Sequence, residues 1–325
     1  MILHRPLRHL VPALALATAF AALPAQAQEW PTQTVRLLVG SPPGAPSDIV
    51  ARTVAESLGT SLGHPVVVEN RPGAGLNLAA GAVASAKPDG HTFLVTSDTV
   101  MTVNPLIYSS LSFDARKDLV PVSVLAGFTQ MMICNADRGI KTLPELLERA
   151  KTDQLTYASG GSGVPGHLAA EMFLAESGVE MTHVPYRGPA PAITDVVGGV
   201  VDCGFLTTPQ VLPHVQSGRV NALAVSSAKR SGLAPDVPPA AEVGVPNMDA
   251  TFYQFLMAPA GTPDAILDKM QTAAAQVMQR EDTRKRLANL DVDAMGTTRQ
   301  EAVDLLAKTG PRWAEIIEKI NLKVD

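Results

Sequence analysis

Three glycine-rich loops hold most of the residues whose types and spacing could do chemistry. They read SPPGAPSD (41–48), NRPGAGLN (70–77) and SGGSGVPGH (159–167), and each lies between an apolar, β-branched run and a helical pattern. The first backbone N–H groups of a helix have no partner within that helix, so a loop at a helix start can bind a carboxylate or phosphate. We therefore expect the chain to bind a small anion through backbone amides.

A hydrolase site is the main catalytic alternative. Ser159, Ser162, His167 and His183 could be combined into a nucleophile and its base. The sequence GGSG at 160–163 lacks the G-x-S-x-G spacing of a nucleophile elbow, and a histidine at a helix start more commonly orders its loop. We expect no enzyme activity, and an exported hydrolase remains the alternative.

Cofactor and metal sites are not expected. The letters of 161–166 match the dinucleotide fingerprint, but the next strand ends in Tyr186-Arg187 instead of an acidic residue. The seven histidines and two cysteines form no HExxH or CxxC motif, and no carboxylate pair has metal-ligand spacing. The chain is thus expected to bind neither a cofactor nor a metal.

Two pairs of residues have two interpretations each. Arg71 and Arg187 stand beside candidate loops, where each could bind a ligand carboxylate or could tie its loop to the rest of the protein. Cys134 and Cys203 are expected to be separate, buried, small side chains, with a disulfide as the alternative that an oxidising compartment allows.

The elements that position the loops alternate between strands and helices. Continuous apolar strands separated by helices indicate parallel sheets covered on both faces, and hence an α/β fold. The strands are expected at 34–40, 65–69, 155–159, 181–186 and 203–206, and the helices that follow them at 47–62, 76–86, 167–176, 190–197 and 209–216.

Two apolar segments, 119–135 and 251–259, are interpreted as crossings between two doubly wound lobes. Lobe one would be discontinuous, with residues 28–127 and 253–325, and lobe two would comprise 128–252. Two further helices are expected in lobe one, at 263–280 and 298–320, the second interrupted by Gly310-Pro311. A ligand cleft between the lobes follows from this arrangement.

Residues 1–27 have the features of a signal peptide cleaved after Ala27. Arg5 and Arg8 precede an apolar stretch at 10–23, and Ala25-Gln26-Ala27 is a small-x-small cleavage site. The apolar stretch is shorter than the roughly 20 residues that span a bilayer. The mature chain is therefore expected in the periplasm. The acidic balance of the full sequence, 31 Asp and Glu against 26 Lys and Arg, argues against a nucleic-acid partner.

The sequence closely resembles the TctC-like, or Bug, substrate-binding proteins of tripartite tricarboxylate transporters. The matching segments are, in order, VVVENRPGAG (66–75), KPDG (87–90), YASGG (157–161), HL (167–168), VPYRG (184–188), AKR (228–230) and APAGTP (258–263). The resemblance implies a monomeric periplasmic binding protein of the Venus-flytrap type. Such a protein captures a carboxylate and delivers it to membrane permease subunits; a sensor subunit that presents its ligand to a signalling receptor is an alternative.

The resemblance also implies which residues contact the ligand. They are Pro43, Gly44, Ala45, Ser47 and Asp48 in the first loop, Ser97, then Ser159, Gly160, Gly161, Ser162, Gly163, Val164 and His167 in the second loop, and finally Leu206 and Phe255. Four positions depart from the family pattern: Pro46 lacks an N–H, and Val164, Leu206 and Phe255 replace polar or smaller residues. We expect a monocarboxylate or aromatic carboxylate with an apolar body rather than citrate.

Overall fold

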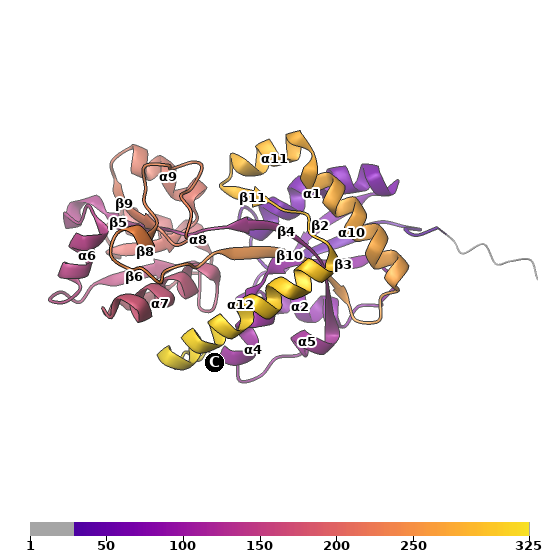
Figure 1. Ribbon diagram of the computed structural model, residues 1–325, viewed down its shortest axis with the longest axis horizontal. Helices are drawn as coiled ribbons and strands as arrows, with labels where there is room; N and C mark the ends of the chain where they lie inside the picture. The colour runs from indigo at the N-terminus through magenta and orange to yellow at the C-terminus, as the bar shows by residue number, and fades with distance from the viewer. Residues whose placement is uncertain (1–28, 325) are drawn as a thin grey trace, which may run out of the picture.

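Two separate β-sheets organise residues 29–324, the part of the chain that this computed structural model describes (Figure 1). The larger sheet, in lobe one, has the order β11-β4-β10-β3-β1-β2, and the smaller, in lobe two, has the order β7-β6-β8-β5-β9. The larger sheet contains β1 (Val35–Val39), β2 (Val66–Asn70), β3 (Thr92–Ser97), β4 (Leu119–Phe128), β10 (Phe252–Pro259) and β11 (Val292–Ala294). The smaller contains β5 (Met131–Asn135), β6 (Thr156–Ser159), β7 (Thr182–Pro185), β8 (Cys203–Leu206) and β9 (Val220–Val225). The two-lobed α/β fold is confirmed.

Both sheets are mixed, which corrects the expectation of parallel sheets. The strands β1, β2 and β3 are parallel, as are β6, β7 and β8. However, β10 runs antiparallel to both β3 and β4, and β5 runs antiparallel to both β8 and β9. The difference arises because the crossing segments themselves become central strands, and apolar character alone does not reveal strand direction.

The chain crosses between the sheets on two neighbouring strands. The segment 119–135 forms β4 in the larger sheet and β5 in the smaller one, with Thr129 and Gln130 between them. On the return path, Ala250 N–H donates to the carbonyl of Ser226 in lobe two, and Phe252 pairs with Phe128 in the larger sheet. The proposed lobe boundaries near 127 and 253 lie at this double crossing.

Helices cover both sheets. They are α1 (Pro46–Leu62), α2 (Asn77–Ala84), α3 (Thr99–Thr102), α4 (Asn104–Ile107), α5 (Ala115–Asp118), α6 (Leu143–Arg149), α7 (Pro165–Ser177), α8 (Pro189–Val197), α9 (Thr208–Gln216), α10 (Asp264–Gln279), α11 (Glu281–Ala288) and α12 (Arg299–Ile320). In α1, Val50, Val54 and Leu58 recur every four residues and are fully buried. The helix ends at Gly63, which adopts the left-handed conformation with φ of 70°.

The last helix, α12, continues through Pro311, which corrects the expected interruption. Its start is fixed by a capping box between Thr298 and Glu301. Beyond the proline, Trp313 stacks on Phe252 with ring centroids 5.4 Å apart, so tertiary packing offsets the lost hydrogen bond. The helix reaches lobe two, where Lys319 Nζ donates to the Ala175 carbonyl (Figure 1).

Cys134 and Cys203 form a disulfide, which corrects the expectation of separate thiols. They are directly opposite each other on the antiparallel strands β5 and β8, with their Cα atoms 3.9 Å apart. The sequence alone could not show this register, because 69 residues separate the two cysteines.

Residues 29–324 contain no helix that is long and apolar enough to span a membrane. The expected signal peptide and its cleavage after Ala27 lie outside the described residues.

Candidate functional site

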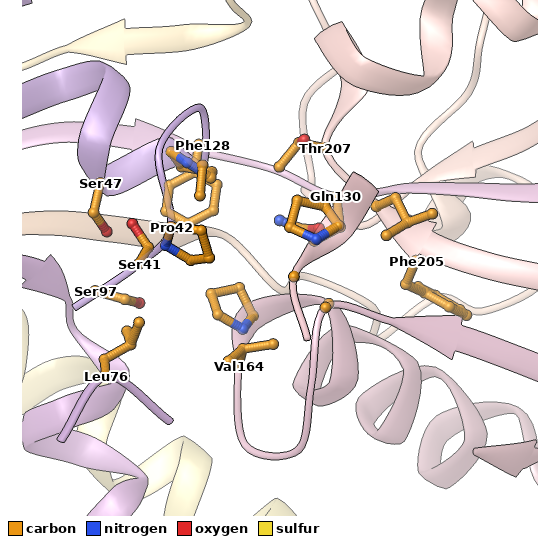
Figure 2. Close-up of a pocket in the computed structure, with 18 of the residues that line it drawn as sticks. Ser41, Pro42, Ser47, Leu76, Ser97, Phe128, Gln130, Val164, Phe205 and Thr207 are labelled. Carbon is orange, nitrogen blue, oxygen red and sulfur yellow. The ribbon is translucent and has the colours of Figure 1, made fainter. Parts of the chain in front are cut away.

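A cavity of about 100 Å³ lies between the lobes (Figure 2). It is bounded by residues at or just after the carboxyl ends of β1, β3, β6 and β8, where open α/β sheets commonly bind ligands. Figure 2 shows Ser41, Ser47 and Ser97 of lobe one facing Gln130 and Thr207 across the cavity.

Four helices begin at this cavity. The N-cap residues of α1, α7, α8 and α9 all line it, and none of these side chains caps its helix; they are Ala45, Val164, Gly188 and Thr207. By contrast, α6 and α12 lie away from the cavity and both begin with complete capping boxes. The free N–H groups and positive dipole ends of the four helices therefore favour an anion in the cavity.

The lining has no charged side chain within residues 29–324. Three of its hydroxyls are already engaged: Ser47 donates to Gln254 Oε1 at 2.7 Å, Ser97 to Asp98 Oδ1 at 3.0 Å, and Thr207 to Gln210 Oε1 at 2.6 Å. The Ser41 hydroxyl is buried and has no hydrogen-bond partner among the described residues. It is available as a neutral donor to a bound acceptor.

The rest of the wall is mainly apolar. Phe128, Phe205, Leu206, Val164 and Leu76 all contribute to it. A polar ligand group facing these side chains would lose water without gaining a hydrogen bond, which is unfavourable. The cavity is thus suited to an acid group attached to an apolar body.

The structure brings some of the expected contact residues together and separates others. Those that line the cavity are Ala45, Ser47, Ser97, Gly160, Val164 and Leu206. Gly161 and Ser162 line a neighbouring chamber. Pro43, Gly44, Asp48, Ser159, Gly163, His167 and Phe255 line neither space.

Asp48 and Gly44 shape the first loop from outside the cavity. Asp48 Oδ2 accepts from the Gly44 N–H at 2.9 Å, while Oδ1 accepts from Arg52 Nε and Asn70 Nδ2 at 2.8 and 2.9 Å. Gly44 has a positive φ of 82°. Its carbonyl accepts from Gln210 Nε2 of lobe two at 3.2 Å, so this loop also contacts the other lobe.

Ser159 and His167 anchor the second loop from behind. Ser159 Oγ lies 2.7 Å from His183 Nε2 and also bonds the backbone of Gly161. His167 Nδ1 accepts from the Gly163 N–H at 3.0 Å, so this nitrogen carries no proton. Because Ser159 is fully buried and does not line the cavity, its pairing with His183 supports a loop-ordering role.

The imidazole rings of His167 and His183 stack, with their centroids 3.9 Å apart. Burial and the neighbouring His167 lower the pKa of His183 to about 3. Glu171 lies 3.4 Å from His167 Nε2 and accepts from the Tyr157 hydroxyl at 2.6 Å. Burial by itself would raise the pKa of Glu171, but its hydrogen bonds to His167 and Tyr157 keep that pKa below its ordinary value. A compact, hydrogen-bonded cluster thus holds the loop.

Strand alternation explains the position of Phe255. On β10, Gln254 faces the cavity, so Phe255 points to the opposite face, where it is fully buried against the apolar layer that includes Leu38 and Met257. The sequence interpretation selected Phe255, which replaces a smaller residue of the family pattern, and missed its neighbour Gln254. The period-two pattern of the strand could have identified it.

Other lining residues were also missed. They are Ser41, Pro42, Pro46, Leu76, Phe128, Gln130, Pro165, Gly166, Gly188, Pro189, Phe205 and Thr207. Several stand in the loops that the sequence had singled out, at 41–48, 70–77 and 159–167, but which residues of a loop face the cavity depends on backbone conformation.

Comparisons with known proteins identify the family of the chain. Residues 50–322 match the tripartite tricarboxylate transporter family receptor, TctC. Protein BugT of Bordetella pertussis (strain Tohama I) is 31% identical, over 95% of this chain and 96% of its own length. A UPF0065 protein of Bordetella bronchiseptica is 34% identical, over 98% of this chain and 97% of its own length.

Two solved structures show the same fold with ligands bound. Rpa4515 of R. palustris with adipate has a TM-score of 0.86 at 29% identity and covers 91% of this chain and 99% of that one. MatC of Rhodopseudomonas palustris with malate has a TM-score of 0.82 at 29% identity, with 89% and 100% coverage. The chain belongs to the TctC family of tripartite tricarboxylate transporter receptors, which are periplasmic solute-binding proteins.

Proposed function

We propose that this protein captures a small carboxylate in the periplasm and delivers it to the membrane permease subunits of a tripartite tricarboxylate-type transporter. The observation that carries the proposal is the meeting of four uncapped helix starts at one cavity whose described lining has no charged side chain. Neutral donors at helix starts bind an anion and leave no charge buried when it departs.

The number of donors is sufficient for useful affinity. A hydrogen bond to a charged group contributes about 1.5 to 3 kcal/mol, so three or four such bonds can reach the roughly 8 kcal/mol of a micromolar complex. Candidate donors are the first-turn amides of the four helices and the Ser41 hydroxyl. An arginine at the bound acid group is not needed.

The body of the ligand is proposed to be apolar. Val164 and Leu206, two of the residues that depart from the family pattern, both line the cavity beside Phe128 and Phe205. Monocarboxylates and aromatic carboxylates belong to the class that fits. Citrate would place a hydroxyl and two further carboxylates against this wall, which offers few hydrogen bonds to replace their hydration.

The test uses the mature protein and calorimetry. Mass spectrometry of any ligand retained through purification identifies candidates, and titration then ranks hexanoate, benzoate, adipate, malate and citrate. We expect an acid with an apolar body to bind more tightly than citrate and to raise the melting temperature by mass action. Tighter binding of citrate, or a reaction product in the same samples, would contradict the proposal.

Delivery to a permease is tested separately, in cells. Deletion of this chain should abolish uptake of the best-ranked acid while the membrane subunits are still expressed. Uptake that persists unchanged would show that the protein captures the acid but does not deliver it to the permease.

A further inference from the structure

A second, larger chamber of about 500 Å³ lies next to the cavity. The two spaces share five lining residues, Pro42, Leu76, Gly160, Val164 and Gly188. The cavity and the chamber therefore adjoin along these residues. Both lobes form the chamber, through the 72–76 loop and Tyr108 of lobe one and the 160–164 and 186–188 segments of lobe two.

Arg187 is the charged residue of this chamber within the described chain. Its side chain is exposed and forms no hydrogen bond or ion pair with residues 29–324. Arg71 differs: its Nη2 lies 3.8 Å from the Glu69 carboxylate, and it lines neither space. The sequence left two roles open for each arginine, ligand binding or tying its loop to the protein. The structure distinguishes the two residues, because Arg71 is paired within its own lobe and Arg187 is not.

Other donors lie in the same chamber. The Ser162 hydroxyl contributes to its lobe-two wall, and the ring of Tyr108 lies against Gly75 and Gly163, where the two lobes approach each other. Tyr186 also lines the chamber, but its hydroxyl already donates to Asp195 at 2.6 Å. With one positive charge and no lining carboxylate among the described residues, the chamber favours an anionic or strongly accepting group.

The 73–76 loop on the opposite wall has an unusual backbone. Gly73, Ala74, Gly75 and Leu76 all have positive φ values, of 134°, 47°, 57° and 78°. For Ala74 and Leu76 this conformation is unfavourable, and such strain is retained where surrounding structure imposes it. The loop thereby gives the chamber a defined lobe-one wall.

We propose that this chamber binds the far end of the ligand and that Arg187 binds an anionic group there. The inference rests on the proposed function and narrows its ligand. The preferred molecule is an elongated acid. One carboxylate lies at the four helix starts, the apolar body lies along the residues that line both spaces, and a second anionic group binds Arg187.

The experiment compares acids that differ only at the far end. Butyrate and succinate, hexanoate and adipate, and octanoate and suberate are titrated into the mature wild-type protein, the Arg187→Gln variant and the Arg71→Gln variant. Arg71→Gln is the matched control, because it removes an equal charge from a neighbouring loop outside the chamber. Melting temperatures of all three proteins establish that each is folded.

We expect one diacid to bind more tightly than the monoacid of the same length in the wild type. Arg187→Gln should lower the affinity for that diacid about tenfold, because a charge-assisted bond at an exposed site is lost. It should change the affinity for the monoacid less than about twofold. Arg71→Gln should affect neither, and added salt should weaken the diacid more than the monoacid.

The outcomes separate the inference from the proposed function. If monoacids bind and the second carboxylate adds nothing, or if Arg187→Gln weakens both members of a pair equally, the inference is overturned and the proposed function stands. If no acid of any length binds, the proposed function fails, and the inference fails with it.

Discussion

Asp98 is a buried carboxylate with no cationic partner among the described residues, and its replacement should change the pH dependence of stability. It follows β3 directly and is fully buried. Its Oδ1 accepts from the Tyr253 N–H at 3.1 Å and from the Ser97 hydroxyl, while Oδ2 has no partner among the described residues. Burial raises the pKa of Asp98 from 3.8 to about 6, and the hydrogen bonds offset this only in part.

The sign and size of the effect follow from this difference in pKa. The folded state holds its proton more tightly than the unfolded state, so the associated stability is present below pH 3.8 and is lost as pH rises through about 6. A difference of about two pKa units corresponds to roughly 3 kcal/mol. Asp98→Asn mimics the protonated form and should therefore gain about that much relative to the wild type between pH 4 and pH 8.

The assay is urea unfolding of wild type and Asp98→Asn at pH 4, 5, 6, 7 and 8, followed by circular dichroism and tryptophan fluorescence together. Comparing the two proteins at each pH removes the contribution of His183, which is common to both. Asp236→Asn, a substitution at an exposed carboxylate, is the control and should show no such change. The reasoning is refuted if the difference in unfolding free energy between wild type and Asp98→Asn is the same at pH 4 and pH 8.

Three further predictions concern the loop, the disulfide and the cavity wall. His167→Asn places its amide oxygen near the position of Nδ1, where it can still accept from the Gly163 N–H, whereas the amide oxygen of His167→Gln lies near the position of Nε2. Calorimetry with the best-ranked acid should therefore show a complex weaker by about fivefold or more only for the glutamine variant; equal affinities would exclude this anchoring role. Replacing Cys134 and Cys203 by serine opens a loop of 69 residues and should lower the unfolding free energy by about 4 kcal/mol, measured against wild type in urea; an unchanged midpoint would contradict it. Val164→Ser adds a hydroxyl at the cavity and should raise the affinity for malate relative to hexanoate about tenfold, and an unaltered ratio would show that Val164 does not select the ligand.

Local patterns were enough to identify the elements that build the site. The apolar run before 41–48 and the four-residue spacing of Val50, Val54 and Leu58 predict a strand, a loop and a helix, and the structure has β1, the loop and α1 there. These features depend on neighbours in the chain, because a helix and a strand each impose their own side-chain period. The crossing segments were recognised for the same reason, but their strand direction was not.

The amino-acid sequence by itself determined the α/β alternation, the loops at helix starts and, through ordered motifs, the family. Tertiary structure decided which residues of the loops and of β10 face the cavity, so that Gln254 lines it and Phe255 does not. It also decided that Cys134 lies opposite Cys203 and that Arg187 is unpaired within the described chain while Arg71 is not. The physical reason is the distance along the chain. The register of paired strands and the positions of the two lobes depend on residues far apart in the sequence, whereas helix starts and apolar strand runs depend on adjacent residues.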